Sequence, residues 1–157
     1  MTNASDTLTV LAARDRYLAE NGFDAKYAER WVKLQAGPIP LSFPNAAGRV
    51  RAVKLHDLHH VATGYHTTWT GEAEIGAWEL ASGCGRFVWA WVLNLAALPI
   101  GLVLAPRAIF HAFVRGRHSA NLYRTRGEVD DELLAKRLGA LRAELRLDRP
   151  APRARPR

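Results

Sequence analysis

The chain has 157 residues, which corresponds to about one domain, and its 48% hydrophobic residues suffice for one buried core. Its single cysteine, Cys84, excludes an intramolecular disulfide and a multi-thiolate zinc site. The formal net charge of +7 favours anionic partners, such as acidic phospholipid, an anionic small molecule or nucleic acid. Nothing beyond this charge supports nucleic acid.

The N-terminal segment is expected to be helical. Ser5 or Asp6 is predicted to cap a first helix, which Gly22 ends, and Asp24 a second helix, which ends at Gly37. No basic stretch followed by an apolar run is present, so the sequence predicts no signal peptide and a cytoplasmic location.

Three prolines in residues 38–45 exclude a continuous helix there and predict a loop. Asn45 is expected to cap the next helix, which Gly64 ends. Thr68 or Thr70 can cap the helix that follows.

Residues 87–105 form an apolar run without a charge that is long enough to span a bilayer. Asn94 and Pro99 lie inside the run, and Pro99 with Gly101 predicts a break between two shorter helices. The favoured interpretation is two buried helices that line a lipid groove, while insertion of the run into a membrane stays open.

Helical signals continue toward the end of the chain. A helix is expected through Phe110 to Gly116, followed by an amphipathic helix over residues 128–147. Residues 148–157 are rich in arginine and proline and are predicted to be a disordered basic tail. The predicted fold class is therefore all-α: a single helical domain over residues 1–147, with about six to seven helices and a metal site between two of them.

Four of the six histidines lie in residues 54–72. On a helical wheel His56 and His60 are one turn apart with Asp57 beside them, so both imidazoles can reach one cation. Glu72, at the start of the helix that returns, is placed to add a second carboxylate. Two imidazoles and two carboxylates suit Zn²⁺, with Fe²⁺ or Mn²⁺ as alternative occupants.

His59 lies about 100° from His60 on the same wheel, so His59 and His66 are not expected to be ligands. The alternative interpretation is a metal-free helix surface, although buried His and Asp side chains without a cation would need several compensating hydrogen bonds. A His-Asp phosphohydrolase needs a histidine upstream of His56, and a membrane di-iron hydroxylase needs several histidine boxes; the six histidines fit neither class.

The pattern His56-Asp57-x-x-His60, then eleven residues, then Glu72, resembles the metal motif of the coenzyme Q (ubiquinone) biosynthesis protein 4 family. The resemblance covers about His56 to Arg126 and includes the Thr-Gly turn after the motif and the segment RAIFHAFVRGRHSANLY. Residues 24–53 depart from the longer helical region that precedes the motif in the family.

The resemblance implies an all-helical protein that binds zinc through His56, Asp57, His60 and Glu72 and accommodates a polyprenyl chain. We therefore expect a protein of ubiquinone biosynthesis that is peripherally associated with the inner membrane and supports oxidative C1 decarboxylation of a polyprenyl hydroxybenzoate. The implied partners are a polyprenyl quinone precursor or another isoprenoid lipid, the membrane surface and other quinone-biosynthesis proteins. Two questions stay open: whether the protein is itself a metal-dependent decarboxylase (lyase) or a non-catalytic prenyl-lipid-binding scaffold with a structural metal, and whether it forms a homo-oligomer.

A second group of polar residues is a candidate for substrate binding. Arg107, His111 and Arg115 recur at every fourth residue of a predicted helix, and Arg117 follows. They are predicted to bind an anionic headgroup or aryl carboxylate, a solvated basic face being the simpler interpretation for any one of them.

Overall fold

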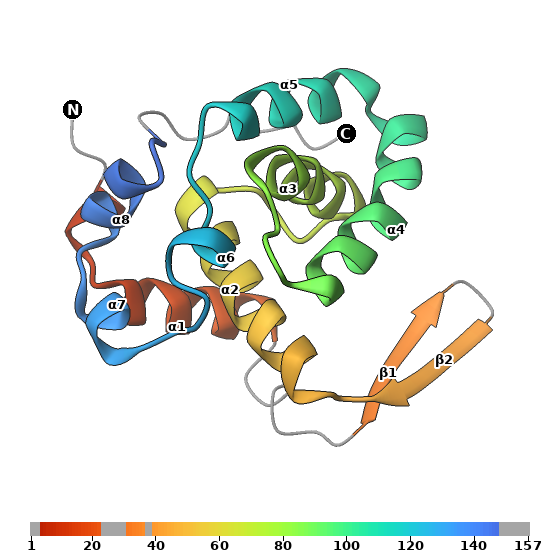
Figure 1. Cartoon of the computed structure of the whole chain (residues 1–157), viewed down its shortest axis with the longest axis horizontal. Helices are drawn as coiled ribbons and strands as arrows, with labels where there is room; N and C mark the ends of the chain where they lie inside the picture. The colour runs from red at the N-terminus through yellow and green to blue at the C-terminus, as the bar shows by residue number, and fades with distance from the viewer. Residues whose placement is uncertain (1–3, 23–30, 37–38, 148–157) are drawn as a thin grey trace.

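The structure is a computed structural model that describes residues 4–22, 31–36 and 39–147 (Figure 1). The predicted cap Asp24 and the predicted tail, residues 148–157, lie outside the described residues. The longer helices are α1 (Val10–Asn21), α2 (Ala47–Thr63), α3 (Trp69–Ser82), α4 (Val88–Leu104) and α5 (Pro106–Arg117). The shorter elements are a 3-10 helix η1 (Ala4–Thr7), strands β1 (Trp31–Ala36) and β2 (Ile39–Pro44), and helices α6 (Leu122–Thr125), α7 (Asp131–Ala135) and α8 (Leu138–Glu144). The predicted helical class is confirmed.

Helix α3 is central to the packing. Figure 1 shows it nearly end-on, with α5 above it, α4 to its right and α2 to its lower left. It contacts all three of these helices, and Trp78 in its middle is fully buried. The buried side chains, mostly leucine and alanine, form one cluster around it. Because protein interiors are close-packed, side chains that α2 and α3 direct toward each other are held in place from both sides.

The ends of α2 and α3 follow most of the predicted signals. Gly64 ends α2 in the left-handed conformation, with φ of 80°, which glycine adopts without strain. The Thr68 hydroxyl caps α3 by accepting a hydrogen bond from the Gly71 N–H at 3.2 Å. The prediction for Asn45 was wrong: Ala46 is the N-cap of α2 without a side-chain bond, and the Asn45 amide oxygen accepts from Arg49 instead.

The first helix is also capped differently than predicted. Thr9, and not Ser5 or Asp6, accepts the capping bond of α1, from the Ala12 N–H. Ser5 and Asp6 lie within η1, one short element earlier. Gly22 ends α1 in the left-handed conformation as predicted.

An antiparallel hairpin of β1 and β2 replaces part of the predicted second helix and the predicted loop. The helix expected to end at Gly37 is wrong over residues 31–36, and residues 39–44 are a strand. The register pairs Gln35 with Pro40 and Trp31 with Pro44. Proline is tolerated because each strand of an isolated two-stranded ribbon has an open edge, where a missing N–H breaks no ladder bond.

Helix α4 runs unbroken through Pro99, so the predicted division at Pro99 and Gly101 was wrong. The helices separate instead at Ala105, and Pro106 occupies the first turn of α5. Backbone N–H groups in the first turn have no partner within the helix, so the N–H that proline lacks is not missed there. In the described ranges, no helix combines the length and the apolar character needed to cross a membrane.

The single helix predicted over residues 128–147 is divided into α7 and α8. Between them the chain is extended, because it forms a short β-bridge with the N-terminal segment at Thr9 and Arg137. The Val10 N–H donates to the Lys136 carbonyl at 2.8 Å, and the Leu138 N–H donates to the Leu8 carbonyl at 2.9 Å.

Candidate metal centre

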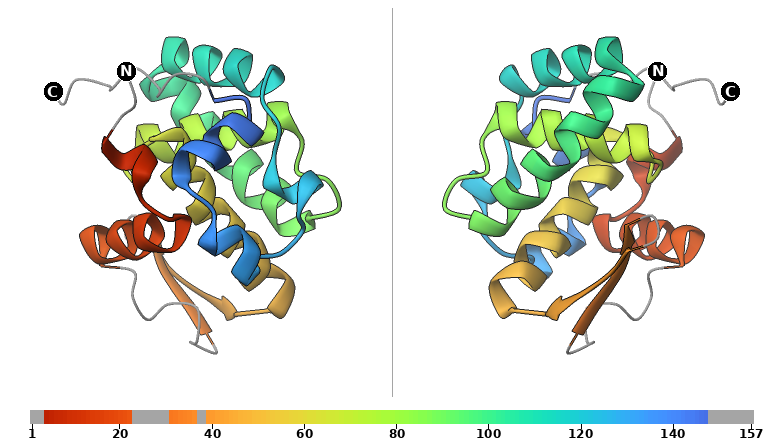
Figure 2. Two further views of the ribbon diagram at one scale, coloured as in Figure 1. Left: turned by 90° about the vertical axis from the view of Figure 1, so that its left-hand side faces the viewer. Right: turned by 90° about the vertical axis from the view of Figure 1, so that its right-hand side faces the viewer.

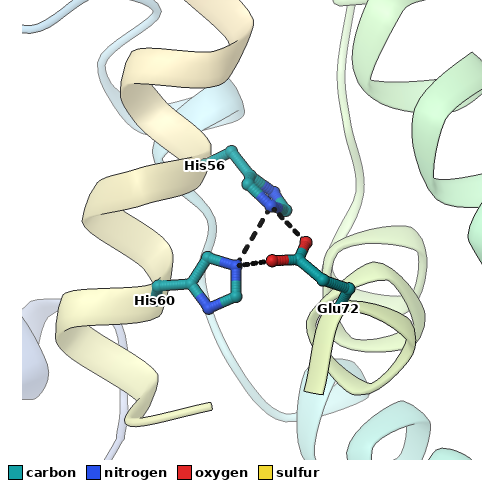
Figure 3. A group of neighbouring side chains, drawn as sticks. All are labelled: His56, His60 and Glu72. Atoms are coloured by element: carbon teal, nitrogen blue, oxygen red, sulfur yellow. Dashed lines mark hydrogen bonds and ion pairs between the residues drawn. The ribbon is translucent and has the colours of Figure 1, made fainter. Parts of the chain in front are cut away.

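Three side chains from two helices converge between α2 and α3 (Figure 3). His56 and His60 come from α2, and Glu72 comes from the first turn of α3. The two Nε2 atoms are 3.2 Å apart, and each is 3.4 Å from an oxygen of the Glu72 carboxylate. These are the potential ligand atoms of a metal ion, and they come from residues that the sequence predicts as ligands.

The chain between the two helices brings Glu72 back to the histidines. Gly64 turns the chain at the end of α2, and residues 65–68 lead into α3. A side chain at Gly71 would overlap the carbonyl oxygen of His66, so only glycine allows this loop to lie against the start of α3. Glu72 follows Gly71 in the first turn of α3, so its side chain lies next to α2.

Hydrogen bonds on the far side of each imidazole fix the proton positions. His60 Nδ1 lies 3.0 Å from the Tyr65 carbonyl oxygen, which can only accept, so this nitrogen carries the hydrogen. His56 Nδ1 lies 3.0 Å from the carboxylate of Glu79 and donates to it. His60 Nε2 therefore presents a lone pair to the site, and His56 Nε2 does so when His56 is neutral. Such bonds behind metal-binding histidines orient the rings toward the ion.

The donor set and its spacing fit a small divalent ion. A tetrahedral Zn²⁺ with ligands at about 2.0–2.1 Å separates its ligand atoms by about 3.3 Å. The observed separations of 3.2 and 3.4 Å match this value. Two histidines and one carboxylate are also the donor set of non-haem Fe²⁺ sites, and three protein ligands leave a coordination position for another molecule.

The predicted fourth ligand, Asp57, is not brought into this group. Its side chain is buried, and its charge acts on Arg49 and on Tyr123. One residue along a helix is a rotation of about 100°, so a side chain next to His56 in sequence faces a different neighbour. The structure thus assembles three of the four predicted residues.

A fully buried carboxylate, Glu79, supports the centre from behind. One of its oxygens accepts from His56 Nδ1 at 3.0 Å and from His59 Nδ1 at 2.6 Å. The other accepts from the Asn94 amide at 2.6 Å and from the Tyr123 hydroxyl at 3.4 Å. Buried charge is tolerated in proteins when it is paired and hydrogen-bonded in this way.

The ionisation states follow from these contacts. Burial would raise the pKa of Glu79, but the positive charge of His56 and the hydrogen bonds from His56 and His59 outweigh it, so the pKa lies below the usual value. Burial would lower the pKa of His56, but Glu79 and Glu72 hold it well above 6.5. Burial lowers the pKa of His59, whose Nε2 accepts from the Leu122 N–H at 3.1 Å, so His59 is neutral.

The carboxylate of Glu72 is ionised at neutral pH. Burial would raise its pKa, but the hydrogen bond and positive charge of His56, with the imidazole of His60 beside it, lower it to about 2. An ionised carboxylate beside two imidazoles is what a divalent cation requires of its ligands.

An apolar pocket of about 440 Å³ adjoins two of the three ligands. His56, Glu72 and Glu79 form part of its wall, together with Asn94 and Tyr123. The rest is apolar and comes mainly from α2 and α4: Ala52, Val53, Ala90, Leu93, Ala96, Ala97 and Ile100, with Trp69 at the start of α3. An apolar cavity of this size with a few polar groups at one place is typical of a site for a small organic molecule.

The predicted substrate-binding residues lie on α5 and are not among the residues that line this pocket. Arg107, His111 and Arg117 are exposed to solvent. Arg115 donates to the Thr63 carbonyl at the end of α2 and lies over the Tyr65 ring. The structure therefore does not bring them to the metal ligands.

His59, His66 and Cys84 lie outside the group of candidate ligands. His66 is exposed, whereas His59 is fully buried between the rings of Trp78 and Tyr123. Cys84 is buried, and burial together with the nearby Glu79 raises its pKa to about 12, which excludes a nucleophilic thiolate at neutral pH.

Glu79 was expected either at the surface or behind the ligands, although two signals in the sequence point to a buried position. Glu79 follows Glu72 by seven residues, which is two helical turns, so both carboxylates face α2. Asn94 is the one polar residue in the apolar run 87–105, and a buried amide requires a buried partner. Together these signals indicate a carboxylate inside the core.

Comparison of the chain with protein-family models, curated proteins and solved structures gave no match. The resemblance to the coenzyme Q biosynthesis protein 4 family therefore rests on the residues quoted above, and the function that it implies is a proposal.

Metal binding should weaken as the pH falls, because the proton and the metal compete for His56. The raised pKa of His56 means that the metal-free protein holds this proton at neutral pH, and a bound ion displaces it. We expect affinity to decrease by about tenfold per pH unit below the pKa of His56 and about one proton to be released per ion. Calorimetric titration with zinc in buffers of different ionisation enthalpy measures this; no proton release at neutral pH would contradict the assignment.

Proposed function

We propose that this chain is a metal-binding, membrane-peripheral protein of ubiquinone biosynthesis that supports decarboxylation of a polyprenyl hydroxybenzoate. In this proposal the ring carboxylate lies at His56, His60 and Glu72, and the ring and the first part of the polyprenyl chain occupy the pocket. The observation that carries the proposal is the position of two of the three candidate ligands, His56 and Glu72, in the wall of an apolar pocket.

The pocket suits a molecule with an anionic end and an apolar body. Its volume of about 440 Å³ is within the range of about 300–1,000 Å³ that is usual for small-molecule sites. The polar side chains Asn94 and Tyr123 both bond to Glu79, so the remaining lining offers mostly apolar contact. A long hydrocarbon chain gains free energy from such a lining, at about 25 cal/mol per Å² of apolar surface removed from water.

The residues of the centre have separate roles in this proposal. His56 and His60 would hold the metal ion through Nε2, and the ionised Glu72 would supply the negative ligand. Glu79 fixes the orientation of His56, and the apolar lining excludes water from the site. A bound divalent ion supplies Lewis-acid stabilisation of the negative charge of the substrate.

The overall reaction is balanced by an external oxidant. The bond between the ring carbon and the carboxyl carbon breaks, carbon dioxide leaves, and a hydroxyl group takes its place on the ring. The oxidant in this proposal is dioxygen. One of its oxygen atoms enters the product, and the other leaves as water with two protons and two electrons from an external donor.

The test is release of labelled carbon dioxide from a carboxyl-labelled polyprenyl hydroxybenzoate, under air with a reductant and with metal-loaded protein. We expect release by the wild type and by His66→Ala, which alters an exposed histidine next to the motif. Glu72→Gln should reduce the rate by at least about 100-fold, because the negative ligand is lost. Equal rates for wild type and Glu72→Gln would contradict the proposal.

The alternative is a non-catalytic prenyl-lipid-binding scaffold in which the metal connects α2 to α3. The three-residue ligand set favours the first reading, since structural zinc sites are closed by four protein ligands. The two differ in what Asp57→Asn does. A four-ligand site that Asp57 closes would lose zinc affinity, whereas an open three-ligand site keeps its metal. The melting temperature does not distinguish the two, because the buried Asp57 also interacts with Arg49.

A further inference from the structure

The outward side of α4 is apolar along its whole length. Exposed apolar side chains recur at helical spacing from Val88 to Val103, through Trp91, Val92, Leu95 and Leu102. Val103 is 83% exposed and Val88 is 70% exposed. The helix has 17 residues, so the stripe is about 25 Å long. A surface helix normally carries charged residues on its outward side, and α4 carries none.

The apolar surface continues onto α5. Phe110, Phe113 and Val114 are exposed there, while Ile109 and Ala112 face the core. The right-hand view of Figure 2 shows α4 across the front of the molecule with α5 above it. We call the exposed apolar side chains of the two helices the α4–α5 surface. Contiguous apolar surfaces of this kind mark interaction sites.

The charged residues of the segment that carries this surface are all positive. Residues 80–127 contain no aspartate or glutamate and six arginines. Arg86 precedes α4, and Arg107 and Arg117 are exposed on α5 beside Phe110 and Phe113. Apolar side chains that are flanked by arginines are the pattern of helices that lie in the interface of an anionic membrane.

We propose that the α4–α5 surface docks flat into a bilayer that contains anionic phospholipid. The charge pattern argues against a second copy of the chain as the occupant, since two identical surfaces would bring arginines together without a carboxylate from this segment to pair with them. The inner side of α4 packs on α3, with Asn94 buried against Glu79, so the helix lies along the membrane as part of the domain.

This docking gives the pocket a route to the bilayer, and that step rests on the proposed function. Ile100 of α4 lines the pocket and is 43% exposed, and Trp69 lines it and is 66% exposed. Ile100 therefore belongs both to the pocket lining and to the α4–α5 surface. An isoprenoid chain in the membrane therefore reaches the pocket along α4 without crossing water.

The test is flotation of the full chain with vesicles of phosphatidylcholine alone and with vesicles containing about one-third phosphatidylglycerol. We expect the wild type to bind the anionic vesicles and to release them at high salt. Leu95→Glu with Val103→Glu should lower the bound fraction at least about tenfold. The matched control, Leu11→Glu with Ala19→Glu, adds the same charge at exposed positions of α1 and should bind like the wild type.

Three outcomes would overturn the docking proposal. The wild type does not float, the α4 variant floats as well as the wild type, or the wild type is a dimer in sedimentation velocity that the α4 variant converts to a monomer. Zinc content and circular dichroism of each variant separate this result from the proposed function. A variant that keeps metal and fold but loses membrane binding affects docking alone, and a wild type that floats without ever binding metal contradicts the proposed function alone.

Discussion

His60→Ala and Glu72→Gln are expected to lose metal binding, with dissociation constants for zinc at least about 100-fold higher than that of the wild type. Each change removes one of three ligands, and the two that remain hold a divalent ion weakly. The measurement is competition with a chromophoric chelator, followed by metal analysis of the dialysed protein.

The two variants separate ligand loss from damage to the fold. His60 is buried, stacks on Tyr17 and donates to the Tyr65 carbonyl, so its removal also costs about 1–3 kcal/mol of stability. Glu72→Gln keeps the shape of a partly exposed side chain and should leave the fold intact. His66→Ala is the control and should bind zinc like the wild type. A Glu72→Gln protein with wild-type affinity would exclude this centre as the metal site.

Glu79→Leu should be the most destabilising single change near the site, with a loss of about 3–5 kcal/mol in the unfolding free energy of the metal-free protein. The substitution leaves His56, His59 and Asn94 without their shared acceptor inside the core, while the Tyr123 hydroxyl keeps the Ala52 carbonyl at 3.2 Å. Buried donors without a partner incur their full desolvation cost. Urea unfolding monitored by circular dichroism measures the difference.

Glu79→Gln should separate the two roles of this residue, which are to accept hydrogen bonds in the core and to place a negative charge behind His56. Its amide oxygen can still accept from both histidines, and the Asn94 amide can turn to accept from its NH₂ group, so most of the stability should return. The negative charge behind His56 is lost, and metal affinity should fall by about 10–100-fold. Glu74→Leu and Glu74→Gln are the controls, since Glu74 lies on the same helix and does not contact the network. Equal losses for Glu74→Leu and Glu79→Leu would show that the network does not carry this stability.

The helical parts of the fold could be predicted where local signals act alone. Gly22, Gly64 and Thr68 each end or begin a helix as expected, because left-handed glycine and threonine capping depend on nearby backbone. The failures depend on distant partners. Lys136 and Arg137 are extended because they meet the N-terminal segment, and α4 continues through Pro99 because its apolar residues pack on α3.

The same distinction applies to the site. The spacing of His56 and His60 on one helix fixes their common direction, and the turn at Gly64 returns Glu72 to them. Asp57 is about 100° from His56 on the helical wheel but only about 60° from His60, so the spacing alone did not exclude it as a ligand. The role of Glu79 depends on contacts with α2, α4 and Tyr123, which lie 15 to 44 residues away in sequence. The position of the pocket follows from the path of α4, which the expected break at Pro99 concealed.

His56 lies between two carboxylates on one face of α3, with Glu79 at Nδ1 and Glu72 at Nε2. In the protein without a bound ion, the proton on His56 supplies the positive charge that the cation would supply. It neutralises the same carboxylate and keeps α2 and α3 in the same alignment. The entropy of ordering the ligands is then lost during folding and not during metal uptake. Unlike a zinc finger, which unfolds when its ion is removed, this protein should exchange metal reversibly in its folded state.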